Sequence, residues 1–248
     1  DFTREEVEAA LEEYSSTLID EEDEFIDEEE PAEPRFEEEE TEENSGEIEP
    51  EGKEEEKEIE PGPGEIFESK DLSGLDLSGI NFLGISLKNT NLEKTNLSNC
   101  ILSNSTLDQA KLREANLSNA EMENINCLEA NVQNANFNSA NLQGAKFLGS
   151  NLSGSNLESA NLRKSIFLGA NLSKCNLNEA DLSNADFSKT NLNQSSIVES
   201  NLTRARFNEA NLESTDLTDS RLSMSVFFEA NFKNANMNRT LVKGAKLA

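Results

Sequence analysis

An apolar residue occupies every fifth position from Leu72 to Leu247, and this register holds through 36 consecutive positions. Leucine fills most of these positions, and phenylalanine fills eight of them. Neither an α-helix, with a period of 3.6, nor a flat β-strand, with a period of 2, keeps one residue in five on a single side for this long. The chain is therefore predicted to form a coil of short segments, each of which turns a corner after five residues.

Each five-residue unit combines one large and one small apolar position, and we call the large position the centre of the unit. Two residues before the centre, the chain from Thr90 onward carries Ala, Ser, Thr or Cys, except at Ile125, where the centre is the smaller Cys127. This exchange keeps the inward volume roughly constant, as close packing requires. The residue just before the centre is usually Asn or Asp, which predicts that the corners lie there.

A second period of 20 residues runs through the same region. Phenylalanine recurs at this spacing at centres 147, 167, 187, 207 and 227, and asparagine recurs at 131, 151, 171, 191, 211 and 231. These columns predict that four units close one turn of the coil, so the 36 units make about nine turns. At a strand spacing of about 4.8 Å the resulting rod is roughly 43 Å long.

Units such as Ala-Asn-Leu-Gln-Gly at 140–144 resemble the pentapeptide repeat family, whose unit is written A(D/N)LXX. The resemblance covers about residues 67–248. It implies an all-β fold, a right-handed quadrilateral parallel β-helix in which four units form each square coil. Some members of the family dimerise through a C-terminal helix, which this sequence lacks. We therefore expect either a truncated chain or an end-to-end contact of the last coil with another subunit or partner.

The N-terminal quarter of the chain differs sharply from the repeat region. Residues 1–67 carry 31 acidic and 4 basic side chains, whereas residues 68–248 carry 19 acidic and 17 basic ones. Residues 1–20 are predicted to contain a short helix, because Thr3 and Glu6 fit a capping box. After the capping box, Val7, Leu11, Tyr14 and Leu18 form one apolar stripe along the predicted helix. A helix this short needs a surface on which to dock, either the end of its own repeat stack or a partner.

Residues 21–65 are predicted to be an acidic, disordered linker, because like charges with few large apolar residues do not support a core. Phe25, Ile26 and Phe36 interrupt the acidic run as a candidate recognition motif, although a plain solvating tail without a specific partner is the simpler interpretation. The repeat domain then covers residues 66–248. Large residues at small positions, Leu75, Ile80 and Ile85, indicate a first coil whose interior is closed by Phe67, Ile66 or the leader helix.

The sequence argues against enzymatic activity. It contains no His, and its three Cys fall at inward positions (Cys100, Cys127 and Cys175), where they are predicted to be small core residues. No phosphate-binding glycine motif is present, and a rod filled by its own side chains has no internal pocket. We therefore expect no catalytic residue, no metal site and no cofactor.

Nucleic-acid binding is not expected either, because the rod lacks a net basic field. The opposite hypothesis is mimicry of DNA, since the resemblance extends to quinolone-resistance members that bind gyrase through an acidic surface. The nearly neutral rod does not favour this hypothesis. Mimicry requires a continuous acidic stripe, whereas a scaffold requires a neutral or apolar docking surface.

One side of the predicted rod is unusually apolar. Ten apolar residues flank a centre in the repeat region, and six of them lie on the side that contains the phenylalanine column: Leu128, Leu148, Ile166, Leu168, Val226 and Phe228. An apolar surface patch more often marks an interaction site than scattered residues do. These six residues form the candidate partner-binding surface, unless they turn into the corners and pack locally.

Together these features predict a non-enzymatic scaffold, a rigid rod with an acidic arm that acts as a subunit or assembly factor of a larger complex. The alternative is a regulator or inhibitor of a nucleic-acid enzyme by mimicry or occlusion, and a third option is a plain structural spacer. No apolar run approaches the length of a membrane span, so a soluble, intracellular protein is expected. The resemblance points to a cyanobacterial cell or a chloroplast, in the stroma or thylakoid.

Overall fold

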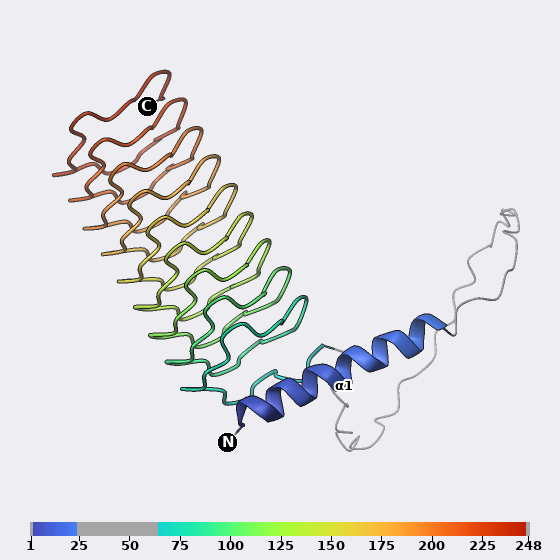
Figure 1. Cartoon of the computed structure of the whole chain (residues 1–248). Coiled ribbons are helices and arrows are strands. Elements are labelled where there is room, and N and C mark those ends of the chain that lie inside the picture. Colours follow the sequence, from blue (N-terminus) through green and yellow to red (C-terminus); the bar gives the residue numbers. More distant parts are fainter. Residues whose placement is uncertain (1, 24–63, 247–248) are drawn as a thin grey trace, which may run out of the picture.

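The computed structural model describes residues 2–23 and 64–246, with the side chains of residues 17–23 left out. It consists of a long rod and one helix, α1 (Arg4–Asp23), which lies at the N-terminal end of the rod and projects beyond it (Figure 1). The helix ends at Asp23, three residues past the predicted boundary at residue 20. The candidate motif of Phe25, Ile26 and Phe36 lies outside the described residues.

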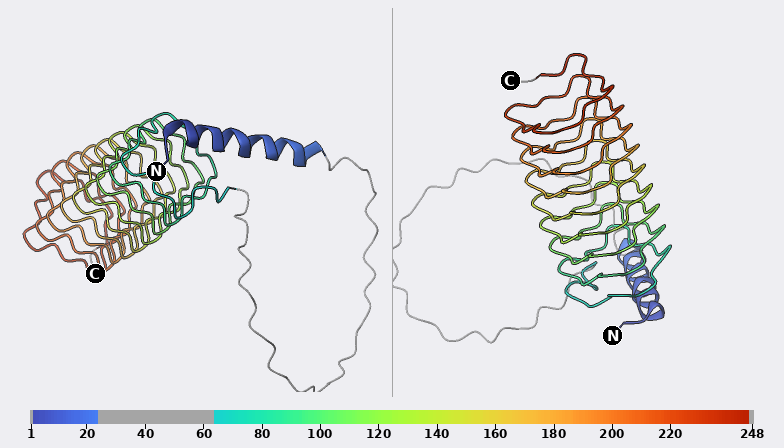
Figure 2. Two further views of the ribbon diagram at one scale, coloured as in Figure 1. Left: turned by 90° about the horizontal axis from the view of Figure 1, so that it is seen from below. Right: turned by 90° about the vertical axis from the view of Figure 1, so that its left-hand side faces the viewer.

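The rod is a stack of coils joined by parallel backbone pairing. Bridges link each residue that precedes a centre to the residue 20 positions later, from Asp71↔Asn91 to Val226↔Lys246. Four such bridges follow one another at five-residue steps, so each coil has four sides, and the coils nest closely when seen from below (Figure 2). The predicted parallel β-helix with a 20-residue coil accounts for this pairing.

The corner of each unit is the second residue after the centre, where the backbone adopts the left-handed conformation. Examples are Lys164 with φ 58°, Asn184 with φ 60° and Gly154 with φ 74°. The prediction that the Asn or Asp before the centre forms the corner is therefore wrong by three residues. That Asn instead fixes the turn through its side chain, since Oδ1 of Asn156 accepts the backbone N–H of Glu158 at 3.2 Å.

The interior is filled by one large and one small side chain from each unit. On one side, Phe147, Phe167, Phe187, Phe207 and Phe227 lie one above another, with ring centroids 5.0–5.2 Å apart and rings within 10° of parallel. This separation is close to the strand spacing of about 4.8 Å, so the coil repeat itself imposes the ring stacking. Buried hydroxyls at the small positions are satisfied by the backbone, as where Thr95 Oγ1 donates to the carbonyl of Leu72 at 2.8 Å.

The N-terminal end of this core is covered by α1. The side chain of Val7 is fully buried in the core, and Phe2 packs edge-to-face on Phe67, which packs in turn on Phe82. The capping box forms as predicted, because Thr3 N donates to Glu6 Oε2 at 2.7 Å and Glu6 N to Thr3 Oγ1 at 3.2 Å. The helix and Phe67 thus close the first coil together.

The last described coil has no such cover. Phe232 is half-buried, and Met237 and Val242 are exposed, although the equivalent centres of inner coils are buried. Among residues 64–246 no further coil lies above these three side chains. The surface at which an end-to-end contact was predicted is therefore apolar.

Candidate docking surfaces on the rod

The side of the rod whose centres run from Leu87 to Phe227 in steps of 20 is here called the phenylalanine side. Each of its units presents two outward residues, one before and one after the centre. In three successive coils the residue after the centre is leucine: Leu128, Leu148 and Leu168. Parallel pairing holds these coils in register, as between Lys146 and Ile166.

These leucines form a continuous apolar strip, which we call the leucine ridge, with Ile166 beside its last coil. Leu128 is 44 % exposed and Leu168 is 41 % exposed, whereas Leu148 and Ile166 are half-buried. Asp108 and Lys146 flank the ridge at a shallow depression of about 200 Å³ that Leu128 and Leu148 also line. The ridge is therefore a shallow, mainly apolar surface with one charge of each sign beside it.

The other two predicted members of the surface lie apart from the ridge. Phe228 is 49 % exposed and Val226 is half-buried. Two polar coils, with Asp186 and Ser188 in one and Arg206 and Asn208 in the next, separate this pair from Leu168. The six residues predicted from the sequence thus fall into two groups on the same side of the rod.

Backbone hydrogen bonding on the rod surface depends on the residue before each centre. Where that residue is Asn or Asp, it usually accepts the backbone N–H of the residue after the centre, as Asn151 Oδ1 does from Ser153 N at 3.2 Å and Asp186 Oδ1 from Ser188 N at 2.9 Å. At Leu148 and Leu168 the corresponding residues are Lys146 and Ile166, which offer no such acceptor. Within the described part of the chain, these two N–H groups have no hydrogen-bond partner. The ridge therefore presents backbone donors next to its apolar side chains.

The predicted docking helix lies against its own rod. Val7 is buried, Leu11 and Tyr14 are half-buried against the core, and the side chain of Leu18 is outside the described residues. The sequence left open whether this helix caps the repeat stack or binds a partner. The part of the helix whose side chains are described covers the first coil.

The sequence reasoning missed a groove between α1 and the first coil. Leu83, which is 54 % exposed, lines it together with Leu11, Ile80 and Ile85. The only signal in the sequence was one isolated leucine directly after the centre Phe82, and it has no evident meaning until the position of the helix is known.

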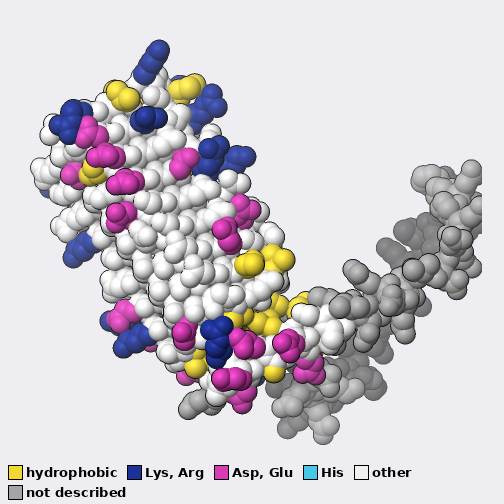
Figure 3. Space-filling model, in the orientation of Figure 1, with side chains coloured by type: hydrophobic (Ala, Val, Ile, Leu, Met, Phe, Trp, Pro, Cys, Tyr) yellow, Lys and Arg dark blue, Asp and Glu magenta, His cyan; other side chains and the backbone are white. Residues whose placement is uncertain are grey.

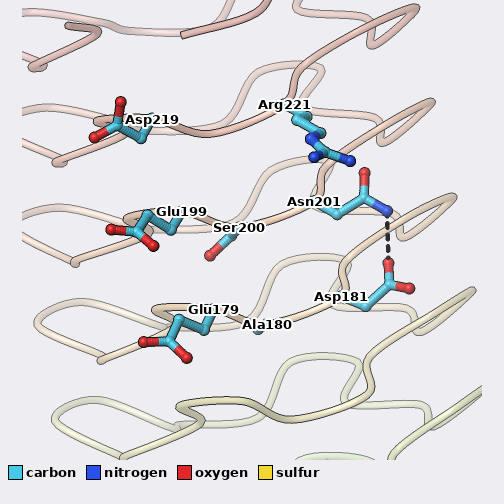
Figure 4. A pocket seen from close by; sticks show the side chains of 8 residues that line it. All are labelled: Glu179, Ala180, Asp181, Glu199, Ser200, Asn201, Asp219 and Arg221. Carbon is cyan, nitrogen blue, oxygen red and sulfur yellow. Dashed lines mark hydrogen bonds between the residues drawn. The ribbon is translucent and has the colours of Figure 1, made fainter. Parts of the chain in front are cut away.

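A second groove, of about 570 Å³, runs along a corner of the rod and is polar (Figure 4). Glu179, Glu199 and Asp219 are stacked in successive coils along one edge. On the other edge Asn201 Nδ2 donates to Asp181 Oδ1 at 3.1 Å. Within residues 2–23 and 64–246 no group of three or more His, Cys, Asp or Glu side chains is placed to hold a metal ion.

Burial makes the three cysteines unreactive. All three are buried, and burial raises the pKa of the Cys100 thiol to about 11 and that of Cys175 to about 12. Burial raises the pKa of Cys127 as well. Because the thiolate is the nucleophile and the metal ligand, thiols held neutral in the core have neither role.

Apart from the short row of Glu179, Glu199 and Asp219, charges of opposite sign are interspersed along the rod surface. Ion pairs join neighbouring coils, among them Arg206–Asp186 at 2.7 Å, Lys233–Glu213 at 3.2 Å and Arg163–Asp181 at 3.5 Å. Blue and magenta side chains are correspondingly interspersed on the visible surface (Figure 3). This arrangement is not the continuous acidic stripe that mimicry of DNA requires. In the described part of the chain, no helix has the length and apolar character needed to cross a membrane.

Comparisons with known proteins agree with the repeat. A family model described as pentapeptide repeat region matches residues 170–247, and one described as pentapeptide repeats (8 copies) matches residues 71–104, 90–126 and 120–158. No curated protein matched the chain.

Among solved structures, the chain is similar to a trypsin-treated variant of QnrB1, a plasmid-mediated fluoroquinolone resistance protein. The identity is 14 %, the match covers 73 % of this chain and 88 % of that one, and the TM-score is 0.63, which shows a shared fold. HetL, involved in heterocyst differentiation regulation in Nostoc sp. strain PCC 7120, is 23 % identical over 73 % of this chain and 88 % of its own, with a TM-score of 0.41. A pentapeptide repeat protein from the Arabidopsis thaliana thylakoid lumen is 23 % identical over 63 % of this chain and 71 % of its own, with a TM-score of 0.18.

Proposed function

The chain belongs to the pentapeptide repeat family, and we propose that it is a non-enzymatic interaction module that holds a protein partner on its leucine ridge. In this proposal the rod is a rigid subunit or assembly factor of a larger complex. We extend the proposal to an origin in a cyanobacterium or a chloroplast.

The observation that carries the proposal is the coincidence of two features at the same coils. Leu128, Leu148 and Leu168 are stacked outward, and in the described part of the chain the backbone N–H groups of Leu148 and Leu168 have no hydrogen-bond partner. Solvent-facing leucines contribute little to the fold, whereas burying them under a partner is favourable by about 25 cal/mol per Å². The two backbone N–H groups supply directional donors for carbonyl or carboxylate oxygens of that partner.

The alternative function is inhibition of a nucleic-acid enzyme, and its support is the fold shared with QnrB1. The ion pairs between coils argue against it, because they neutralise acidic residues such as Asp186 and Glu213. Residues 1–67 carry 31 of the 50 acidic side chains, whereas the 19 acidic side chains of residues 68–248 are nearly balanced by 17 basic ones. The first proposal therefore fits the rod surface better.

The test is affinity capture with three matched forms of the whole chain. The form with Leu148→Ser and Leu168→Ser is expected to capture at least tenfold less partner than the unchanged chain, because both apolar contacts are removed. Ile101→Ser is the control, because Ile101 is 40 % exposed, nearly the same as Leu168, but lies on another side of the rod. It is expected to retain the partner.

Two further measurements make the result decisive. Urea midpoints of the three forms should agree, since surface substitutions usually change stability by less than about 0.5 kcal/mol. A chain without residues 1–65 shows whether the arm contributes to capture. If the double variant is folded and captures the same partner as strongly as the unchanged chain, the ridge is not the docking surface.

A further inference from the structure

We propose that the groove between α1 and the first coil binds an extended, basic segment of a partner protein, which pairs with the open backbone edge of the first coil at Asn81 and Leu83. This site lies on a different side of the rod from the leucine ridge and is independent of it.

The groove has the size and lining of a peptide site. Its volume is about 630 Å³, α1 contributes Leu11 and Tyr14 to one wall, and the rod contributes Ile80, Leu83 and Ile85 to the other. Hydrophobic side chains gather where α1 meets the rod in the space-filling view (Figure 3). An apolar side chain of a bound segment therefore has a place to be buried.

The rod offers unpaired backbone groups at the same place. In the second coil, the carbonyl of Ile101 accepts from Phe82 N at 2.7 Å and that of Ser103 from Gly84 N at 3.1 Å. The equivalent groups of the first coil are the carbonyls of Asn81 and Leu83 and the N–H of Asn81. In the part of the chain that the structure describes, none of these three groups has a hydrogen-bond partner.

On the two neighbouring sides the chain covers this edge itself. The Arg4 guanidinium donates to the carbonyls of Asp76 and Ser78 at 3.2 and 3.1 Å, and so replaces the backbone donors of a preceding coil. On the other neighbouring side, Ser86 N donates to the carbonyl of Gly64 at 2.8 Å. The edge at Asn81 and Leu83 is left open between them, and an open edge beside apolar side chains is the setting in which an added strand binds.

The charge of the groove selects a basic segment. Glu8 and Glu12 line it, and residues 2–16 of the chain carry five glutamates and one arginine. That arginine, Arg4, is already engaged by Glu8 at 2.7 Å and by the two carbonyls. Lysine or arginine beside the apolar anchor of a partner segment would therefore meet the carboxylate of Glu12, which has no ion-pair partner in the described part of the chain, whereas an acidic segment would be repelled.

A peptide selection experiment tests the proposal while the natural partner is still unidentified. A library of random ten-residue peptides displayed on phage is selected on the full chain, and binders of the Leu83→Ser form are removed. We expect the surviving sequences to combine Lys or Arg with large apolar residues. By fluorescence anisotropy, such a peptide should bind at least tenfold more weakly to the Leu83→Ser form, and equally well to a Leu168→Ser form.

Backbone pairing is tested by N-methylation of the selected peptide, one amide at a time. Methylation of the amides that face Asn81 and Leu83 should weaken binding at least tenfold, and amide exchange at Asn81 should slow in the complex. The proposal is overturned if no enriched peptide depends on Leu83, if the enriched peptides are acidic, or if no single N-methylation weakens binding. A peptide that binds as a helix would show the last of these results.

Discussion

The phenylalanine side and the side opposite to it build the same coil by different means. On the opposite side, whose centres run from Leu77 to Met237 and which we call the asparagine side, side-chain amides form a ladder along the outside. Asn116 donates to Asn96 at 3.0 Å, Asn136 to Asn116 at 3.1 Å and Asn156 to Asn136 at 3.3 Å. On the phenylalanine side, five rings are stacked inside at 5.0–5.2 Å.

This difference shows how a repeat fold makes room for function. Where the rings hold successive coils together from within, the outer position before the centre is free of the ladder. It carries Lys146, Ile166, Asp186 and Arg206 in successive coils. The asparagine side has less freedom, because each amide there serves both its own turn and the next coil. A surface that varies along the rod therefore lies over the ring stack.

The largest expected effect comes from breaking the ring stack. Phe187→Ala removes the middle ring and should lower the free energy of unfolding by about 3–5 kcal/mol, because a cavity replaces a fully buried ring. Leu177→Ala, at a buried centre of the asparagine side, is the matched control and should cost less. Urea denaturation measures both, and equal costs would contradict a stabilising contribution from the ring stack, because Phe→Ala also removes more buried area than Leu→Ala.

The amide ladder is expected to have a smaller effect. Asn156→Ala removes the bonds to Asn136 and from Asn176, and also the one to its own turn at Glu158. The expected loss is about 1–2 kcal/mol, since these partly exposed amides can bond to water instead. Lys146 occupies the equivalent position on the phenylalanine side. Lys146→Ala should change the free energy of unfolding by less than about 0.5 kcal/mol. Similar losses at both positions would contradict the contrast between the two sides.

The smallest effect concerns the ion pair at a corner of the asparagine side. The hydrogen bonds from Arg239 lower the pKa of Asp219 below its ordinary value of 3.8. With a lowered pKa in the folded state, the contribution of Asp219 to stability is present above pH 3.8 and is lost as the pH falls through the folded pKa. Arg239→Gln should raise the pKa of Asp219 toward 3.8 in a carboxyl NMR titration, with the unfolding midpoint at neutral pH almost unchanged, because the pair is exposed. An unchanged Asp219 titration would mean that the pair does not form in solution.

Much of the architecture could be predicted from the sequence because the five-residue register leaves few alternatives. The 20-residue coil and the phenylalanine column followed from spacing, whereas the parallel pairing of the coils was implied by the resemblance to the pentapeptide repeat family. The corner was misplaced, since Asn fits either a left-handed turn or an amide ladder, and the sequence does not distinguish between these uses. Charged residues such as Lys164 at left-handed corners gave no local signal.

The candidate surfaces were less predictable. The stacking of Leu148 and Leu168 followed from the register, but their unpaired backbone N–H groups depend on which residue precedes each centre. The groove at Leu83 depends on where α1 lies, and the repeat carries no information about that. Contacts between a repeat and a non-repeating segment are set by tertiary packing, which spacing does not encode.

The pairing of each residue with the one 20 positions later limits how the rod can change in length. An insertion of five residues keeps every later coil closed, but it moves every later column to the adjacent side. The leucine ridge would then be cut in two and its halves would point in different directions. An insertion of 20 residues lengthens the rod by about 4.8 Å and rotates nothing. Duplication of whole coils thus changes the spacing between two bound partners and leaves every column on its own side of the rod. Shorter insertions change which residues share a side.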